Sequence, residues 1–108
     1  LSKEILPQRL KKCEKKLTLQ PGRCRVGNQR RRWGSCSINQ TISLNWRILL
    51  LPYELGEYVL FHELAHLKHM NHSAQFWQFL EDLMPNAKRL DRELKDVGRT
   101  IIRVGQKV

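Results

Sequence analysis

All four histidines of this 108-residue chain lie within the segment HELAHLKHMNH, from His62 to His72. His62 and His66 have the spacing of one helical turn, and Glu63 lies between them. On an α-helix such residues point about 40° apart on one face, so both imidazoles can reach the same metal ion. A carboxylate at Glu63 then lies beside that ion, near a bound water molecule. The segment therefore constrains the chain to form a helix with two metal ligands on one face.

The expected helix around these residues is apolar on nearly every side, which predicts that it is buried. Its apolar residues are Val59, Leu60, Phe61, Leu64, Ala65 and Leu67. A lone histidine in such a helix is usually a hydrogen-bonded core residue. Burying two histidines and a glutamate is far more costly, unless a strong partner compensates for their lost hydration. A metal ion is such a partner, so we favour metal ligation over a packing role.

A third ligand is needed, because a catalytic zinc ion usually has three protein ligands and one position open to water. His69 lies on the same face as the pair, but about 10 Å beyond His62 along a straight helix, too far to share the ion. The segment MNHS favours a turn, since asparagine tolerates the conformation that ends helices and Ser73 is a good N-cap. That turn can bring His72 back toward the pair. We therefore predict one Zn²⁺ per chain, bound by His62, His66 and His72, although three imidazoles also suit other transition metals.

Hydrophobic periodicity predicts a helix and then a group of strands in the first half of the chain. Residues 8–17 are typical of a basic amphipathic helix that ends before the turn signal LQPG. Residues 23–46 contain short segments rich in Trp, Val, Ile and Thr. These segments predict two or three antiparallel strands, with a hairpin turn at Asn39–Gln40 between the last two.

The second half of the chain is expected to be helical. Pro52 suits a first helical position, and the segment from Tyr53 to Met70 carries leucines at helical spacing. A further helix is expected over residues 74–84, with its apolar side chains on one face. A last helix is expected around residues 90–97, with Gly98 near its end.

Residues 1–108 are expected to form one α+β domain around a single modest core. Hydrophobic residues make up 41% of the chain and charged residues 28%, which is ordinary for a folded domain. The longest aliphatic run, Ile48–Leu51, is far too short to span a bilayer, and no signal segment opens the chain. We therefore expect a cytoplasmic protein, and the start at Leu1 leaves trimming of the N-terminus open.

The chain is strongly basic, with 20 Lys+Arg against 10 Asp+Glu and a formal net charge of +10. The excess is concentrated in the first third, at Arg9, Lys11, Lys12, Lys15, Lys16, Arg23, Arg25, Arg30, Arg31 and Arg32. Such a surface attracts nucleic acids or acidic proteins, although a solvated basic face explains it nearly as well. We take Arg30, Arg31 and Arg32, beside the aromatic Trp33, as candidate nucleic-acid-binding residues, with DNA as the expected partner.

Three cysteines, Cys13, Cys24 and Cys36, form no C-x-x-C pair, which indicates reduced thiols. Cys36 lies beside the arginine cluster, where a lowered pKa can make a thiol nucleophilic, but the histidines have a better use as metal ligands. For Trp33 and Gly34 we favour structural roles. The indole is expected to pack against a helix, and the glycine to permit close approach of strand and helix.

Four segments resemble, in their order along the chain, those of the YgjP-like zinc metallopeptidases, which belong to the wider SprT-like and zincin group. They are RRWGSCS (31–37), ISLNWRI (42–48), LPYELGEYVLFHELAHL (51–67) and NHSAQFW (71–77). The resemblance implies a zincin-like fold, in which a small antiparallel sheet packs on the active-site helix that carries HExxH, flanked by N- and C-terminal helices. It implies that His62, His66 and His72 are the metal ligands and that Glu63 is catalytic.

The expected function is therefore that of a zinc-dependent metallopeptidase, in which a zinc-bound water attacks the peptide bond and Glu63 is the general base. Its partners are peptide or protein substrates, with DNA-associated proteins as one class, since SprT-like relatives include proteases that degrade DNA-linked proteins. The alternative is a non-catalytic, zinc-stabilised module that binds nucleic acid. A structural zinc site is usually closed by a fourth protein ligand, which Cys24 or Cys36 could provide.

Two further parts of a peptidase site stay open at this stage. An exposed edge strand beside the helix can bind an extended substrate by strand addition, but the sequence does not show which segment of residues 23–46 forms that edge. His69, Arg47 and Tyr53 are the candidates for stabilising the oxyanion, and none of them has a geometric argument.

Overall fold

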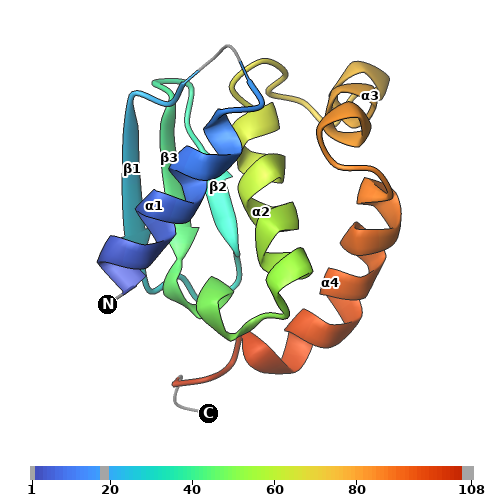
Figure 1. Cartoon of the computed structure of the whole chain (residues 1–108). Coiled ribbons are helices and arrows are strands. Elements are labelled where there is room, and N and C mark those ends of the chain that lie inside the picture. The colour runs from blue at the N-terminus through green and yellow to red at the C-terminus, as the bar shows by residue number, and fades with distance from the viewer. Residues whose placement is uncertain (1, 18–19, 106–108) are drawn as a thin grey trace.

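The computed structural model describes residues 2–17 and 20–105, in which three short strands lie between a first helix and three later ones (Figure 1). In chain order the elements are α1 (Ser2–Glu14), β1 (Arg23–Gly27), β2 (Gly34–Cys36), β3 (Thr41–Asn45), the 3₁₀ helix η1 (Trp46–Leu50), α2 (Tyr53–Ala65), α3 (Ala74–Leu83) and α4 (Ala87–Ile101). The α+β class expected from the sequence is thereby confirmed. No helix of the described residues is long and apolar enough to cross a membrane.

The three strands form one small mixed sheet. β2 pairs antiparallel with β3, with Gly34 opposite Leu44, and the turn between them contains Gln40 in the left-handed region at φ 63°. This pairing confirms the predicted hairpin. β1 pairs with β3 in parallel, with Arg23 opposite Thr41. The prediction that all strands are antiparallel was therefore wrong for β1.

The parallel pairing follows from the path of the chain between β1 and β2. The strand order β1-β3-β2 places β3 between the other two, so β2 runs back and β3 runs forward again beside β1. The buried Asn45, at the end of β3, holds this connection, because its Nδ2 donates to the carbonyls of Gln29 at 3.1 Å and Arg32 at 2.9 Å. Alternating polarity is the same for parallel and antiparallel strands, so the sequence pattern could not distinguish them.

Both α1 and α2 pack against the sheet, α1 beside β1 and α2 beside β2 (Figure 1). The fully buried core includes Leu6, Leu10, Ile42, Leu44, Ile48, Leu60, Leu64, Phe76, Leu80 and Leu90. Full burial of one such side chain stabilises the fold by about 1.5–3 kcal/mol. α2 is therefore the central helix of the molecule, as its all-round apolar sequence predicted.

The first helix differs from its prediction at both ends. It was expected over residues 8–17 and spans Ser2–Glu14, with Pro7 inside it. The earlier start adds Leu6 to the buried face that also contains Leu10, and this burial offsets the hydrogen bond that a proline within a helix cannot donate. After Glu14 the chain continues in turns, in which the backbone N–H of Leu17 donates to the carbonyl of Glu14 at 2.9 Å.

The later helices also correct the predicted boundaries. Pro52 is the N-cap of α2 rather than its first residue, and α2 ends at Ala65 rather than Met70. α3 has Ser73 as its N-cap, as predicted, because the Ser73 hydroxyl accepts a hydrogen bond from the backbone N–H of Phe76. α4 is longer than expected, since it spans Ala87–Ile101, and Gly98 lies in its last turn, near its end as predicted.

Candidate active site

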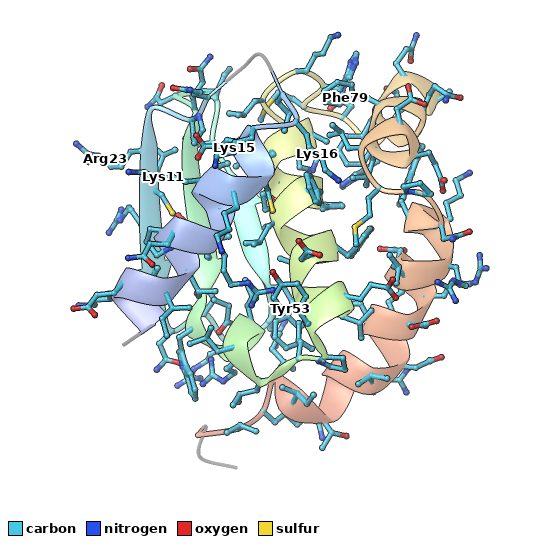
Figure 2. The ribbon with its side chains drawn as sticks, in the orientation of Figure 1. Lys11, Lys15, Lys16, Arg23, Tyr53 and Phe79 are labelled. Carbon is cyan, nitrogen blue, oxygen red and sulfur yellow. The ribbon has the colours of Figure 1, made fainter. Side chains whose placement is uncertain are left out.

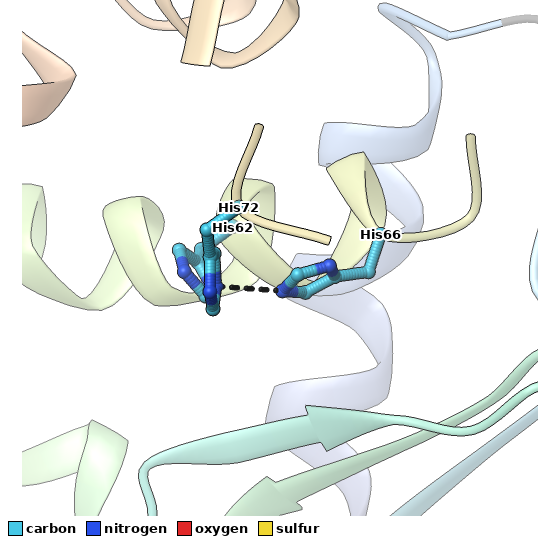
Figure 3. Close-up of side chains that lie close together, drawn as sticks. All are labelled: His62, His66 and His72. Carbon is cyan, nitrogen blue, oxygen red and sulfur yellow. Dashed lines mark hydrogen bonds between the residues drawn. The ribbon is translucent and has the colours of Figure 1, made fainter. Parts of the chain in front are cut away.

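Three of the four histidines meet at the C-terminal end of α2 (Figure 3). His62 lies in the last turn of α2, His66 is its C-cap, and His72 comes from the loop before α3. Their candidate ligand atoms all lie within 4.8 Å of one another, and Nε2 of His66 is 3.2 Å from Nε2 of His72. His62 is half-buried, His66 is buried and His72 is exposed, so the group opens to solvent on the His72 side.

The early end of α2 is what brings His72 to the other two. After Ala65 the chain turns immediately, since the backbone N–H groups of Lys68 and His69 both donate to the Ala65 carbonyl. The Ser73 cap then starts α3 directly after His72. Bends at Met70 and Asn71 agree with the turn predicted at residues 70–73. The predicted helix was too long, because Leu67 also fits the apolar spacing of a longer helix.

The ring of a buried phenylalanine, Phe76, packs against the rings of all three histidines. The Phe76 side chain is fully buried, and its ring centroid lies 5.2 Å from that of His62, 4.5 Å from that of His66 and 4.9 Å from that of His72. From the sequence, Phe76 was expected only as one of the apolar side chains of the helix over residues 74–84, with no link to the histidines. Its position in NHSAQFW, four residues after His72, is the sequence feature that could have predicted this contact.

The donor atoms fit a bound metal ion. Nδ1 of His66 donates to the carbonyl of His69 at 3.0 Å, which fixes the tautomer that leaves Nε2 free to ligate. Burial lowers the pKa of His66 below its ordinary value, so the neutral, ligating form is favoured. Tetrahedral zinc, with Zn–N distances near 2.0–2.1 Å, separates two ligand nitrogens by about 3.3 Å, close to the 3.2 Å between His66 and His72.

Glu63 lies beside the histidines on the same helix. Its side chain is almost fully buried, and its Oε2 accepts a hydrogen bond from Nδ1 of His62 at 3.2 Å. The carboxylate packs against Gly34 of β2. A Cβ atom at Gly34 would lie 3.0 Å from Cγ of Glu63, 3.2 Å from its Oε2 and 3.1 Å from the carbonyl oxygen of Ser43. The predicted close approach of strand and helix at Gly34 is therefore confirmed, and it occurs at the carboxylate of the motif.

The three histidines and Glu63 line one cavity of about 400 Å³. Its opposite wall is the edge strand β2, which contributes Gly34, Ser35 and Cys36. Because the strand order leaves β2 with only one neighbour, this strand is the edge that faces the histidines. Of the segments within residues 23–46, β2 is therefore the edge strand beside the active-site helix, which the sequence did not specify.

Two residues that were not predicted to reach the site also line this cavity. Met70 lines it, and so does Arg32, which borders a second cavity as well. Arg32 was predicted to lie with Arg30 and Arg31 in one basic, candidate nucleic-acid-binding cluster. The carbonyl of Arg32 is held by Asn45 of β3, a contact that no local pattern indicates.

The basic residues do not form a single cluster. Lys11 lies on α1, Lys15 and Lys16 follow directly after its last residue, Glu14, and Arg23 lies on β1 near the same end of that helix (Figure 2). Arg32, in contrast, borders the histidine cavity. The structure therefore separates an α1–β1 group, made of Lys11, Lys15, Lys16 and Arg23, from Arg32 at the histidine cavity.

The cysteines take no part in a metal cluster or a nucleophilic site. Burial, reinforced by the nearby Glu63 carboxylate, raises the pKa of Cys36 to about 11, which is the opposite of an activated thiolate. Cys36 lines the histidine cavity. In the part of the chain that the structure describes, however, the group of side chains that could hold a metal contains histidines alone. Among the described residues, no cysteine is therefore placed as a fourth metal ligand that would close the site.

The three side chains considered for oxyanion stabilisation lie elsewhere. Arg47 is buried and donates to the carbonyls of Val104 at 2.6 Å and Gln29 at 2.9 Å. Tyr53 is exposed at the start of α2 (Figure 2), and the ring of His69 packs on Phe79 with centroids 5.8 Å apart. None of the three lines the histidine cavity.

Comparison with known proteins gives the chain a family. A family model described as YgjP-like, metallopeptidase domain, matches residues 1–97. The crystal structure of the metallopeptidase zymogen abylysin from Pyrococcus abyssi is similar, with 30% sequence identity and a TM-score of 0.73. That match covers 88% of this chain and 97% of abylysin.

A second solved structure shares the fold at lower identity. The metallopeptidase zymogen jannalysin from Methanocaldococcus jannaschii matches with a TM-score of 0.69 and 20% identity, over 91% of this chain and 99% of that one. No curated protein sequence matches the chain significantly. The family match, the abylysin likeness and the three clustered histidines agree with one another, and the chain belongs to the YgjP-like metallopeptidases and is a metal-dependent peptidase.

Proposed function

We propose that this metallopeptidase uses one zinc ion, held by His62, His66 and His72, with Glu63 as the general base. The observation that carries the proposal is the position of Glu63, whose carboxylate lines the same cavity as the three histidines. Three ligands and an adjacent carboxylate are the composition of a catalytic zinc site, whereas a structural site is usually closed by a fourth protein ligand.

The chemistry divides between the ion and the chain. Bound zinc lowers the pKa of a coordinated water toward 7 and polarises the scissile carbonyl. Glu63 accepts the proton that the water loses as its oxygen bonds to the carbonyl carbon. The same carboxyl group then delivers this proton to the leaving nitrogen as the C–N bond breaks. The close packing on Gly34 holds the carboxylate in one place for both transfers.

The substrate backbone is expected to bind along β2. This strand lines the histidine cavity and lies at the edge of the sheet, and the outward N–H and C=O groups of an edge strand can pair with an extended peptide. Strand addition holds a substrate by its main chain, which must be extended. We therefore expect the enzyme to act on unfolded segments of proteins.

A matched pair of histidine variants tests the ligand assignment. His72→Ala removes a proposed ligand, whereas His69→Ala removes a ring that lies outside the cluster and keeps the carbonyl that orients His66. We expect wild type and His69→Ala to bind one zinc per chain and to cleave an unfolded protein. His72→Ala should lose both properties. Equal zinc content and equal cleavage in the two variants would remove His72 from the site.

The narrower substrate class is proteins associated with DNA. The basic α1–β1 group, which includes Lys11, Lys15 and Arg23 (Figure 2), supports it through attraction of phosphates. We expect single-stranded DNA to stimulate cleavage of a DNA-binding protein, and Lys11→Glu with Lys15→Glu to remove the stimulation without changing cleavage in the absence of DNA. DNA binding by a zinc-loaded wild type that cleaves nothing would favour the non-catalytic module instead.

A further inference from the structure

A second cavity, of about 210 Å³, adjoins the histidine cavity and has no role in the function proposed above. The linings of the two cavities share Arg32, Gly34, His62 and Glu63. A peptide whose scissile bond lies at Glu63 therefore places a neighbouring side chain at the mouth of the second cavity. Cavities of this kind commonly determine which substrate side chains a site accepts.

The walls of this second cavity are largely apolar and come from three parts of the chain. Trp33 precedes β2, Val59 belongs to α2 and Leu94 belongs to α4. The indole of Trp33 packs closely on α4 at Gly98, where a Cβ atom would lie only 2.9 Å from its Cζ2. This packing on a helix agrees with the structural role predicted for Trp33 and places the indole as one wall of the cavity.

Two polar side chains of this cavity, Tyr58 and Asp91, already have partners. The hydroxyl of Tyr58 donates to Oδ1 of Asp91 at 2.9 Å, and Nζ of Lys95 lies 3.2 Å from Oδ2 of the same carboxylate. A substrate side chain is therefore not needed to satisfy Asp91. The negative charge of Asp91 repels an acidic substrate side chain, and the positive charge of Arg32, which lines both cavities, repels a basic one.

We propose that this cavity is a specificity pocket that binds a large uncharged apolar side chain, such as Leu, Met or Phe, of a residue flanking the scissile bond. The proposal rests on the peptidase function proposed above. Removing such a side chain from water against Trp33, Val59 and Leu94 favours it over alanine at that position by at least about tenfold in kcat/KM.

The test is a cleavage-site profile of the zinc-loaded enzyme on a peptide library, with variants that change the size of the pocket. Leu94→Phe narrows the pocket and Leu94→Ala widens it, while Val97→Phe adds the same ring to an exposed position of α4 outside the pocket. We expect large apolar residues at one position beside the cleaved bond. The preferred size should decrease in Leu94→Phe, increase in Leu94→Ala and stay unchanged in Val97→Phe. An identical profile in all four proteins would overturn the proposal.

A binding measurement separates failure of the pocket from failure of the peptidase assignment. The probes are N-acetyl-leucine amide and N-acetyl-aspartate amide, followed through the indole N–H signal of Trp33 in NMR spectra, which is assigned by its loss in Trp33→Phe. We expect a saturable shift with the leucine probe, a much smaller one with the aspartate probe, and loss of the difference in Leu94→Phe. If wild type cleaves no peptide but shows this pattern, the pocket stands and the proposed function fails. Equal shifts with both probes would overturn the pocket itself.

Discussion

At the scale of single residues, the site depends on the contact between Gly34 and Glu63. Glu63 is almost fully buried, and the carboxylate has little room because β2 passes directly over it. A general base must be held within hydrogen-bonding reach of the proton that it accepts. Glycine at position 34 is therefore part of the means by which the carboxylate is positioned, although it carries no functional group.

Gly34→Ala is expected to lower activity without removing the metal. The new Cβ atom would lie 3.0 Å from Cγ of Glu63 and 3.1 Å from the Ser43 carbonyl, so the carboxylate or the strand must shift. A displacement of this kind is expected to reduce kcat about 10- to 100-fold, with one zinc per chain retained. The measurement is steady-state cleavage alongside metal content. Gly27→Ala, where the nearest atom to the new Cβ is 3.6 Å away in the Gln29 side chain, is the control. Wild-type kcat in Gly34→Ala would show that the contact does not position the base.

At the scale of elements, the early end of α2 and the cap of α3 together bring His72 into the site. The sequence predicted this meeting for a good reason, since a Ser73 cap after MNHS is a local signal that needs no tertiary information. It did not predict the true end of α2. The turn after Ala65 is fixed partly by the hydrogen bond from Nδ1 of His66 to the His69 carbonyl, and apolar periodicity does not contain that contact.

Ser73→Ala is expected to weaken both the fold and metal binding. Its hydroxyl accepts from the backbone N–H of Phe76 at 3.3 Å, and loss of such a cap costs about 1 kcal/mol in the free energy of unfolding. Because His72 precedes the cap, zinc affinity should also decrease. Urea denaturation of the metal-free protein and a zinc titration measure the two effects. Gln75→Ala, at an exposed position of the same first turn, should change neither. A Ser73→Ala protein with unchanged stability and affinity would contradict the role of the cap.

At the scale of the whole molecule, the sequence predicted the elements better than their arrangement. HExxH, the Ser73 cap and the hairpin at Gln40 are local patterns, and each was found in place. The parallel position of β1 and the presence of Arg32 at the histidine cavity depend on the connection between β1 and β2. That connection is held by Asn45 and Arg47, which lie far along the chain. Long-range contacts of this kind leave no periodic signal in one sequence.

Arg47 shows how much of the global fold such a contact supports. Its side chain joins the connection between β1 and β2 to the C-terminal segment, through the carbonyls of Gln29 and Val104. Arg47→Met is expected to lower the free energy of unfolding by about 2 kcal/mol or more, because it removes the hydrogen bonds that the charged, fully buried side chain donates to the Val104 and Gln29 carbonyls. Urea denaturation measures this loss. Arg103→Met, at an exposed position, should stay near wild type. Equal stability of the two variants would show that Arg47 is not a structural link.

The most direct test of the account compares zinc content and peptide cleavage in wild type, Glu63→Gln and Glu54→Gln. Glu54 is an exposed residue of the same helix, where its side chain is 62% exposed, so its variant controls for the change of charge on α2. The account predicts one zinc per chain in all three proteins, cleavage of an unfolded protein by wild type and Glu54→Gln, and none by Glu63→Gln. Cleavage by zinc-loaded Glu63→Gln at the wild-type rate would contradict the assignment of Glu63 as the general base.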